Sequence, residues 1–170
     1  MEDKIIEGFA YALPALVTGG VAYLILSKFI SLDSNEKKFN ALVQKKKDSL
    51  PIKLQAYERL LLFCERINPT KLLIRVNPIG NETSNYLQLL IANIEQEFEH
   101  NLVQQLYISE DSWKVVLATK LAIIAKLRKV AKTSETAKEL RENTLIDYSK
   151  EENPTETAIA ILKQDVKKLI

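Results

Sequence analysis

Residues Gly8–Leu26, GFAYALPALVTGGVAYLIL, form a run of 19 residues without a charged side chain. A helix rises about 1.5 Å per residue, so this run is about 28 Å long, or about 34 Å if it continues to Ile30. Lys28 would then extend its ammonium group towards the lipid headgroups. Because the hydrocarbon core of a bilayer is about 30 Å thick, we predict a transmembrane helix within residues 6–30. Residues 1–30 are assigned to a membrane anchor.

Two other interpretations of this run fit the residues less well. A cleaved signal peptide has a basic start and an apolar stretch of about 7–15 residues. Here the run is longer, the preceding MEDKIIE has three acids and one lysine, and the Ala10-Tyr11-Ala12 motif lies at the wrong end for cleavage. A buried helix of a soluble domain would need apolar segments around it, and no other segment is apolar enough on all sides.

The charges beside the run predict its orientation. Residues 28–48 contain six lysines against three acids, a local charge of +3, whereas the N-terminal side is acidic. By the positive-inside rule the N-terminus lies outside and the chain beyond residue 30 is cytoplasmic. Five of these lysines could also hold the chain against anionic lipid headgroups. Both roles for the lysines, setting the orientation and binding lipid, stay open. The five lysines are Lys37, Lys38, Lys45, Lys46 and Lys47.

Small residues recur along one face of the predicted membrane helix, at spacings of 4, 3, 4 and 3. They are Gly8, Ala12, Ala15, Gly19 and Ala22. Small side chains let membrane helices approach closely, although such helices are rich in Gly and Ala in any case. The face therefore suggests association with a second copy or another membrane protein, beside the bilayer itself as a partner.

The rest of the chain is predicted to be all-α. It has few residues for tight turns, since the whole sequence holds 4 Gly and 5 Pro. Residues 31–49 are assigned to a basic juxtamembrane helix or linker, and residues 50–170 to a cytoplasmic helical bundle. Helices are expected at 34–47, 51–67, 69–76, 82–106, 110–131, 135–148 and 154–170, with a strand as the alternative for 69–76. Asn68, Ser109, Ser134 and Asn153 are the expected N-terminal caps.

The stripes of apolar residues on these helices predict the core of the bundle. The main core is expected to contain Leu61, Cys64, Leu90, Ile94, Phe98, Trp113, Leu117 and Leu121. Trp113 is expected to anchor the hairpin of helices 82–106 and 110–131. Cys64 is interpreted as a small buried hydrophobe rather than a nucleophile.

Two segments carry a resemblance to a known group of proteins: LQAYERLLLFCERINPTKLLIRV, residues 54–76, and EFEHNLVQQLYISEDSW, residues 97–113. Together with the membrane segment they resemble an uncharacterised family of small membrane-anchored proteins from Bacteroidetes bacteria. The resemblance implies the bacterial inner membrane as location and implies no activity, because no function is assigned to that family.

The composition removes several classes of site. One Cys and one His exclude a disulfide, a Cys-based zinc site and a multi-His metal site within one chain. Glu97 and His100 have the Glu-x-x-His spacing of di-iron bundles, but such a site needs a second copy and further glutamates. There is no Gly-rich phosphate loop, and aromatic residues are not interleaved with the lysines, so neither a cofactor nor a nucleic acid is expected.

These observations favour a membrane-tethered interaction or scaffold module without catalytic activity. The alternative is an enzyme or ligand-binding bundle with a site that no motif reveals. A cleft joining Glu58, Arg59, Glu65, Arg66 and Arg75, with shifted pKa values, would favour that alternative. A subunit of a larger membrane complex without an independent fold is a third possibility.

Overall fold

The computed structural model describes the backbone of residues 2–150 and 153–170, and the side chains of these except at 2–13, 15, 32 and 34–35. The protein is 88% helix, and the described residues contain no strand, only an isolated bridge between Glu82 and Thr136. The chain divides into two compact units, 1–49 and 50–170. The second unit is called the C-terminal domain below.

The first helix, α1, is Glu2–Ile67. Within the described residues, it is the one helix long and apolar enough to cross a membrane, and its side chains from Leu16 to Ile30 are exposed. The expected break between helices 34–47 and 51–67 is wrong. No glycine occurs between residues 21 and 79, and Pro51 removes one N–H from the turn where Lys47 is exposed to water. Water can satisfy the carbonyl that this leaves free.

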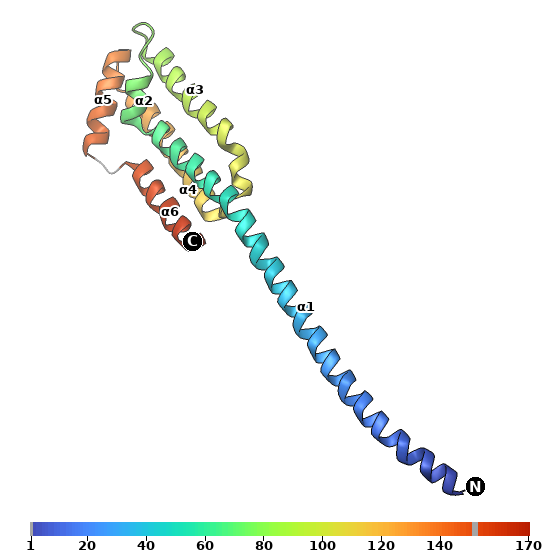
Figure 1. The fold of residues 1–170 in the computed structure, drawn as a ribbon. Helices are drawn as coiled ribbons and strands as arrows, with labels where there is room; N and C mark the ends of the chain where they lie inside the picture. The colour runs from blue at the N-terminus through green and yellow to red at the C-terminus, as the bar shows by residue number, and fades with distance from the viewer. Residues whose placement is uncertain (1, 151–152) are drawn as a thin grey trace. The chain divides into compact units, whose positions relative to one another are not determined.

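The remaining helices gather around the C-terminal part of α1 (Figure 1). The short α2, Pro69–Arg75, settles the choice for residues 69–76 in favour of a helix. Asn68 caps it, and its Oδ1 accepts from the N–H of Thr70 at 3.1 Å. The turn that follows needs Gly80, whose φ of +87° is unfavourable for other residues.

The next two helices are α3, Thr83–Asn101, and α4, Glu110–Ala131. The α3 helix ends five residues earlier than expected, because Leu102–Leu106 form the 3₁₀ turn η1. The expected cap of α4 is confirmed, since the Ser109 side chain accepts from the N–H of Ser112 at 3.1 Å. Trp113, in the first turn of α4, stacks on Phe98 of α3 with 5.4 Å between ring centroids, as an anchor of the hairpin should.

The last two helices are α5, Ala137–Lys150, and α6, Pro154–Leu169. Ser134 does not cap α5, because its hydroxyl donates to the carbonyl of Val130 at 2.9 Å. Thr136 takes that position and accepts from the N–H of Glu139 at 3.1 Å. The cap of α6 is confirmed, with the Asn153 Oδ1 accepting from the N–H of Thr155 at 3.1 Å.

The predicted core is confirmed for Cys64 of α1 and for the residues of α3, and it is shifted in α4. Cys64, Leu90 and Ile94 are fully buried, and Phe98 and Trp113 pack against the core as partly buried rings. Leu121 is 55% exposed, so its assignment to the core is wrong, and Leu117 is only half-buried. The buried face of α4 consists instead of Ser112, Val116, Thr119, Lys120, Ile123, Ile124, Leu127 and Val130. Leu61 of α1 is also only half-buried, so its assignment to the main core is wrong.

Candidate functional site

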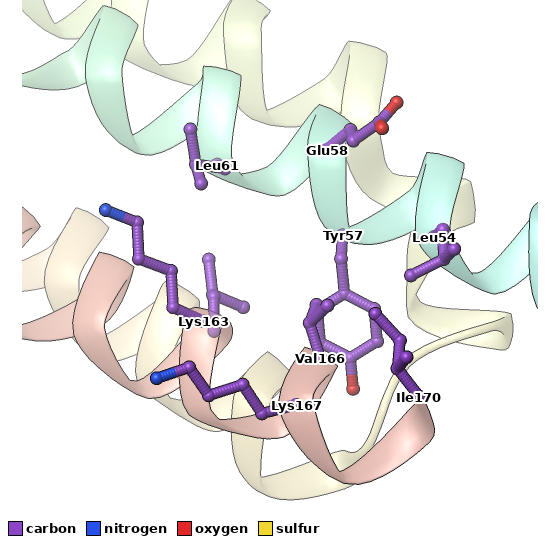
Figure 2. A pocket seen from close by; sticks show the side chains of 9 residues that line it. Leu54, Tyr57, Glu58, Leu61, Lys163, Val166, Lys167 and Ile170 are labelled. Carbon is purple, nitrogen blue, oxygen red and sulfur yellow. The ribbon is translucent and has the colours of Figure 1, made fainter.

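An open groove of about 530 Å³ lies between the C-terminal part of α1 and helix α6 (Figure 2). Apolar side chains dominate its lining, and three charged residues stand among them. The lining residues are Leu54, Tyr57, Glu58, Leu61, Leu162, Lys163, Val166, Lys167 and Ile170. The groove is therefore an apolar surface that α1 and α6 leave partly uncovered.

Helical spacing explains why these residues line one groove. Intervals of three and four residues put Leu54, Tyr57 and Leu61 on one face of α1, and Leu162 and Val166 on one face of α6. Tyr57 and Leu162 are buried at 4% and 1% exposure and form the floor. The leucines at 54 and 61 are half-buried. Leu61, which was predicted to lie in the main core, is thus only partly covered.

The charged residues of the groove are divided between its two sides. Glu58 belongs to α1, whereas Lys163 and Lys167 belong to α6, and all three are exposed. The two lysines are four residues apart, so they project from the same face of α6 (Figure 2). The α6 side of the groove is therefore basic and the α1 side acidic.

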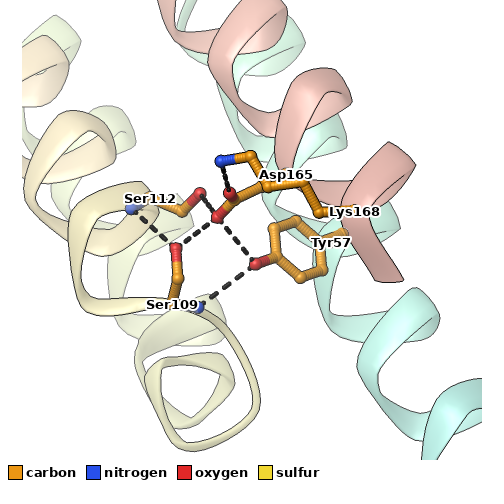
Figure 3. A network of polar contacts seen from close by, with 5 residues as sticks. All are labelled: Tyr57, Ser109, Ser112, Asp165 and Lys168. Carbon is orange, nitrogen blue, oxygen red and sulfur yellow. Dashed lines mark hydrogen bonds and ion pairs between the residues drawn. The ribbon is translucent and has the colours of Figure 1, made fainter. Parts of the chain in front are cut away.

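A cluster of polar groups around Asp165 holds α6 in place beside the groove (Figure 3). One carboxylate oxygen of Asp165 accepts hydrogen bonds from the hydroxyls of Tyr57 at 3.1 Å, Ser112 at 2.8 Å and Ser109. Its other oxygen pairs with the ammonium group of Lys168 at 2.9 Å. The Tyr57 hydroxyl also accepts from the N–H of Ser109 at 3.2 Å. This Asp165 cluster joins α6, α1 and the start of α4.

The surroundings of Asp165 stabilise its charged form. The hydrogen bond from Ser109, the interaction with Lys168, and the bonds from Ser112 and Tyr57 hold the pKa of this carboxyl well below its usual range, against the opposite effect of burial. Since Asp165 supports Tyr57 in the floor of the groove, it is a structural residue of the site.

We expect Asp165→Asn to lower the free energy of unfolding by about 1.5–3 kcal/mol at pH 7, the range for hydrogen bonds to charged groups. A carboxyl whose pKa is depressed by folding stabilises the protein above its unfolded pKa of about 3.9 and loses this effect as the pH falls below it. Urea unfolding of both proteins between pH 7 and pH 2 should therefore show a difference that shrinks below about pH 4. A constant difference across this range would contradict the assignment.

A cleft joining Glu58, Glu65 and the nearby arginines would have favoured a ligand-binding bundle, but Glu65 and two of these arginines pair elsewhere. Arg66 and Arg75 both pair with Glu97, at 3.2 and 3.7 Å, while Glu65 pairs with Lys71. Glu58 lines the groove instead. The described part of the chain contains no group of His, Cys and acidic side chains that could hold a metal ion.

Lys120 and Cys64 are two residues with ionisable side chains that lie within the packed interior. Lys120 is only 7% exposed, and its ammonium group pairs with Glu95 at 2.7 Å and lies 4.0 Å from the ring centroid of Phe98. Cys64 is fully buried, and burial, with the nearby charge of Glu65, raises the pKa of its thiol to about 12. The thiolate form of Cys64 is therefore scarce at neutral pH, which agrees with the interpretation of Cys64 as a buried hydrophobe rather than a nucleophile.

The residues predicted to contact lipid or another helix belong to the first unit. Lys37, Lys38 and Lys45–Lys47 are exposed, and Lys37 pairs with Asp33 at 2.6 Å. Gly19 and Ala22 are exposed, and nothing lies within 4 Å of a Cβ built on Gly19. The side chains of the other three residues of the small face, Gly8, Ala12 and Ala15, lie outside the described residues. Both assignments stay predictions.

Over residues 2–150 and 153–170, the fold is all-helical and contains one candidate membrane-spanning helix, near the N-terminus. The chain belongs to a family of unknown function, DUF7935, whose match covers residues 3–169. No curated protein and no solved structure matches the chain. The expectation of an uncharacterised family is thereby confirmed, and the family itself adds no activity.

Proposed function

We propose that this protein is a membrane-tethered interaction module, whose groove between α1 and α6 receives apolar side chains of a partner protein. The groove carries the proposal, because it leaves apolar side chains of two facing helices uncovered in a domain attached to a membrane-length apolar helix. Uncovered apolar surface beside charged residues is characteristic of interaction sites. We assign no catalytic activity and no cofactor to it.

The location in this proposal is the bacterial inner membrane, with the N-terminus outside and the C-terminal domain in the cytoplasm. The positive charge of residues 28–48 supports this orientation. The exposed lysines at 37, 38 and 45–47 are available to anionic lipids on the same side. The small face of the membrane helix, Gly8 to Ala22, offers a second place for association.

We expect a C-terminal alkaline phosphatase fusion to be inactive, because this enzyme folds only when it is exported and the C-terminal domain should stay in the cytoplasm. A green fluorescent protein fusion at the same position should fluoresce and serves as the matched control. A strongly active phosphatase with a dark fluorescent fusion would reverse the orientation.

The groove itself can be tested by affinity purification of the full-length protein in detergent. Leu61→Asp and Ile170→Asp each put a charge into the groove and should remove the proteins that co-purify with the unaltered chain. Gln164→Asp changes an exposed residue of α6 outside the groove and should retain them. Ile170 is 85% exposed, so this substitution leaves the core intact. Equal recovery with all three variants would refute the groove as the interaction site.

A ligand-binding bundle is the second candidate function. It is supported by the volume of the groove, about 530 Å³, which lies within the range of about 300–1,000 Å³ for small-molecule sites. Native mass spectrometry of the full-length protein from its own host tests it. A bound small molecule that Leu61→Asp releases would favour this candidate over a protein partner.

A further inference from the structure

We propose that the partner segment in the groove is an amphipathic helix that carries acidic residues along one flank, the flank that faces α6. This inference rests on the proposed function and names the chemistry of the partner. It follows from the spacing of the apolar groups in the groove and from the distribution of charge on its two sides.

The apolar residues of the groove repeat with the period of a helix. Leu54, Tyr57 and Leu61 extend over two turns of α1, and Leu162, Val166 and Ile170 extend over two turns along α6. A helix bound lengthwise presents apolar side chains at positions i, i+3 or i+4, and i+7, which cover the same length. Each of the three apolar side chains of the bound helix would therefore contact one residue of α1 and one residue of α6.

The charges of the groove distinguish the two flanks of such a helix. Lys163 and Lys167 are exposed, and the structure gives neither an ion pair within the described part of the chain. The neighbouring Lys168 is different, because it is paired with Asp165. Two lysines one turn apart match acidic residues one turn apart on a bound helix.

Glu58 on the opposite side makes the recognition directional. An acidic residue on the α1 flank of a bound helix would lie beside Glu58, and like charges brought together reduce affinity. The acidic residues are therefore expected on the α6 flank alone. A helix that is acidic on both flanks, or basic on the α6 flank, should bind less well.

The test is photo-crosslinking from within the groove of the full-length protein in its native membranes. The photoreactive residue p-benzoylphenylalanine replaces Leu61, and the crosslinked peptides are identified by mass spectrometry. The same replacement at Gln164, exposed on α6 and outside the groove, is the matched control. We expect Leu61 alone to give a protein adduct, at a segment with apolar residues at i, i+3 or i+4, and i+7 and acids on one flank.

Charge reversal then tests the role of the lysines. In the Leu61 crosslinking protein, Lys163→Glu with Lys167→Glu should lower the yield of this adduct about tenfold, whereas the Lys163→Arg, Lys167→Arg pair should retain it. Both lysines are exposed, so an unchanged melting temperature is expected for either pair.

The outcomes separate the two proposals. A crosslinked helix without acidic residues, or a yield that charge reversal leaves unchanged, would overturn the inference about charge and leave the interaction module standing. A lipid or small-molecule adduct at Leu61, or no adduct there, would overturn the interaction module as well.

Discussion

Phe63→Ala should lower the free energy of unfolding of the C-terminal domain by about 3–5 kcal/mol, the usual cost of deleting a buried phenylalanine ring. Phe63 is 1% exposed, and its ring centroid is 5.9 Å from that of Phe98, which in turn stacks on Trp113. A domain of this size has only about 5–15 kcal/mol of stability in total. The melting temperature of the full-length variant in detergent, followed by circular dichroism, should therefore fall by many degrees.

The neighbouring Leu62 is the matched control for this prediction. Leu62 is 55% exposed, so Leu62→Ala removes an apolar side chain from the same turn of α1 without opening a cavity. Its melting temperature should stay within a degree or two of the unaltered protein. Equal losses in the two variants would mean that the buried face of α1 is assigned wrongly.

The second large effect concerns the membrane anchor. Val21→Asp with Leu24→Asp puts two charges into the C-terminal half of the uncharged run of α1, and a charged residue costs up to about 2.5–3.5 kcal/mol at the centre of a bilayer. We expect this variant to move from the membrane pellet to the soluble fraction when lysed cells are ultracentrifuged.

The control for this second prediction lies on the same helix. Phe39→Asp with Leu42→Asp has the same three-residue spacing and also replaces exposed apolar residues, but outside the uncharged run. This variant should stay in the membrane pellet. If this variant becomes soluble too, membrane attachment needs the juxtamembrane segment as well, and the uncharged run does not anchor the chain by itself.

Signals within a few residues of one another predicted the helix starts. Asn68, Ser109 and Asn153 each accept the expected backbone hydrogen bond. Both partners of such a cap lie within three residues, so the sequence contains the whole interaction. Ser134 failed because its hydroxyl donates to the carbonyl of Val130, and Thr136, two residues later, caps α5 instead.

The buried face of α4 shows what periodicity alone leaves undetermined. Val116 with Lys120 and Leu117 with Leu121 are neighbouring stripes of one helix, and apolar character favoured the second pair. The structure buries the first pair, because Lys120 can place its ammonium group against Glu95 and over the ring of Phe98. These contacts offset the cost of burying a charged group. Because they connect α4 to α3, the sequence of either helix alone does not reveal them.

The groove and the Asp165 cluster were beyond prediction for a similar reason. Their parts come from residues 54–61, 109–112 and 162–170, which are far apart in the chain. Of the apolar residues that line the groove, only Leu61 was assigned to the main core from the sequence. Whether facing stripes close on each other or leave a groove depends on the positions of the helices, which no local pattern contains.

Alkaline carbonate extraction of the unaltered full-length protein tests the central claim, that the chain is anchored in a membrane through α1, most directly. Carbonate strips proteins that are held by surface charge, including any held only by the lysines at 37–47, but leaves proteins that cross the hydrocarbon core. We predict that the protein stays in the membrane pellet. Its release into the supernatant would contradict the anchor and, with it, the membrane-tethered interaction module.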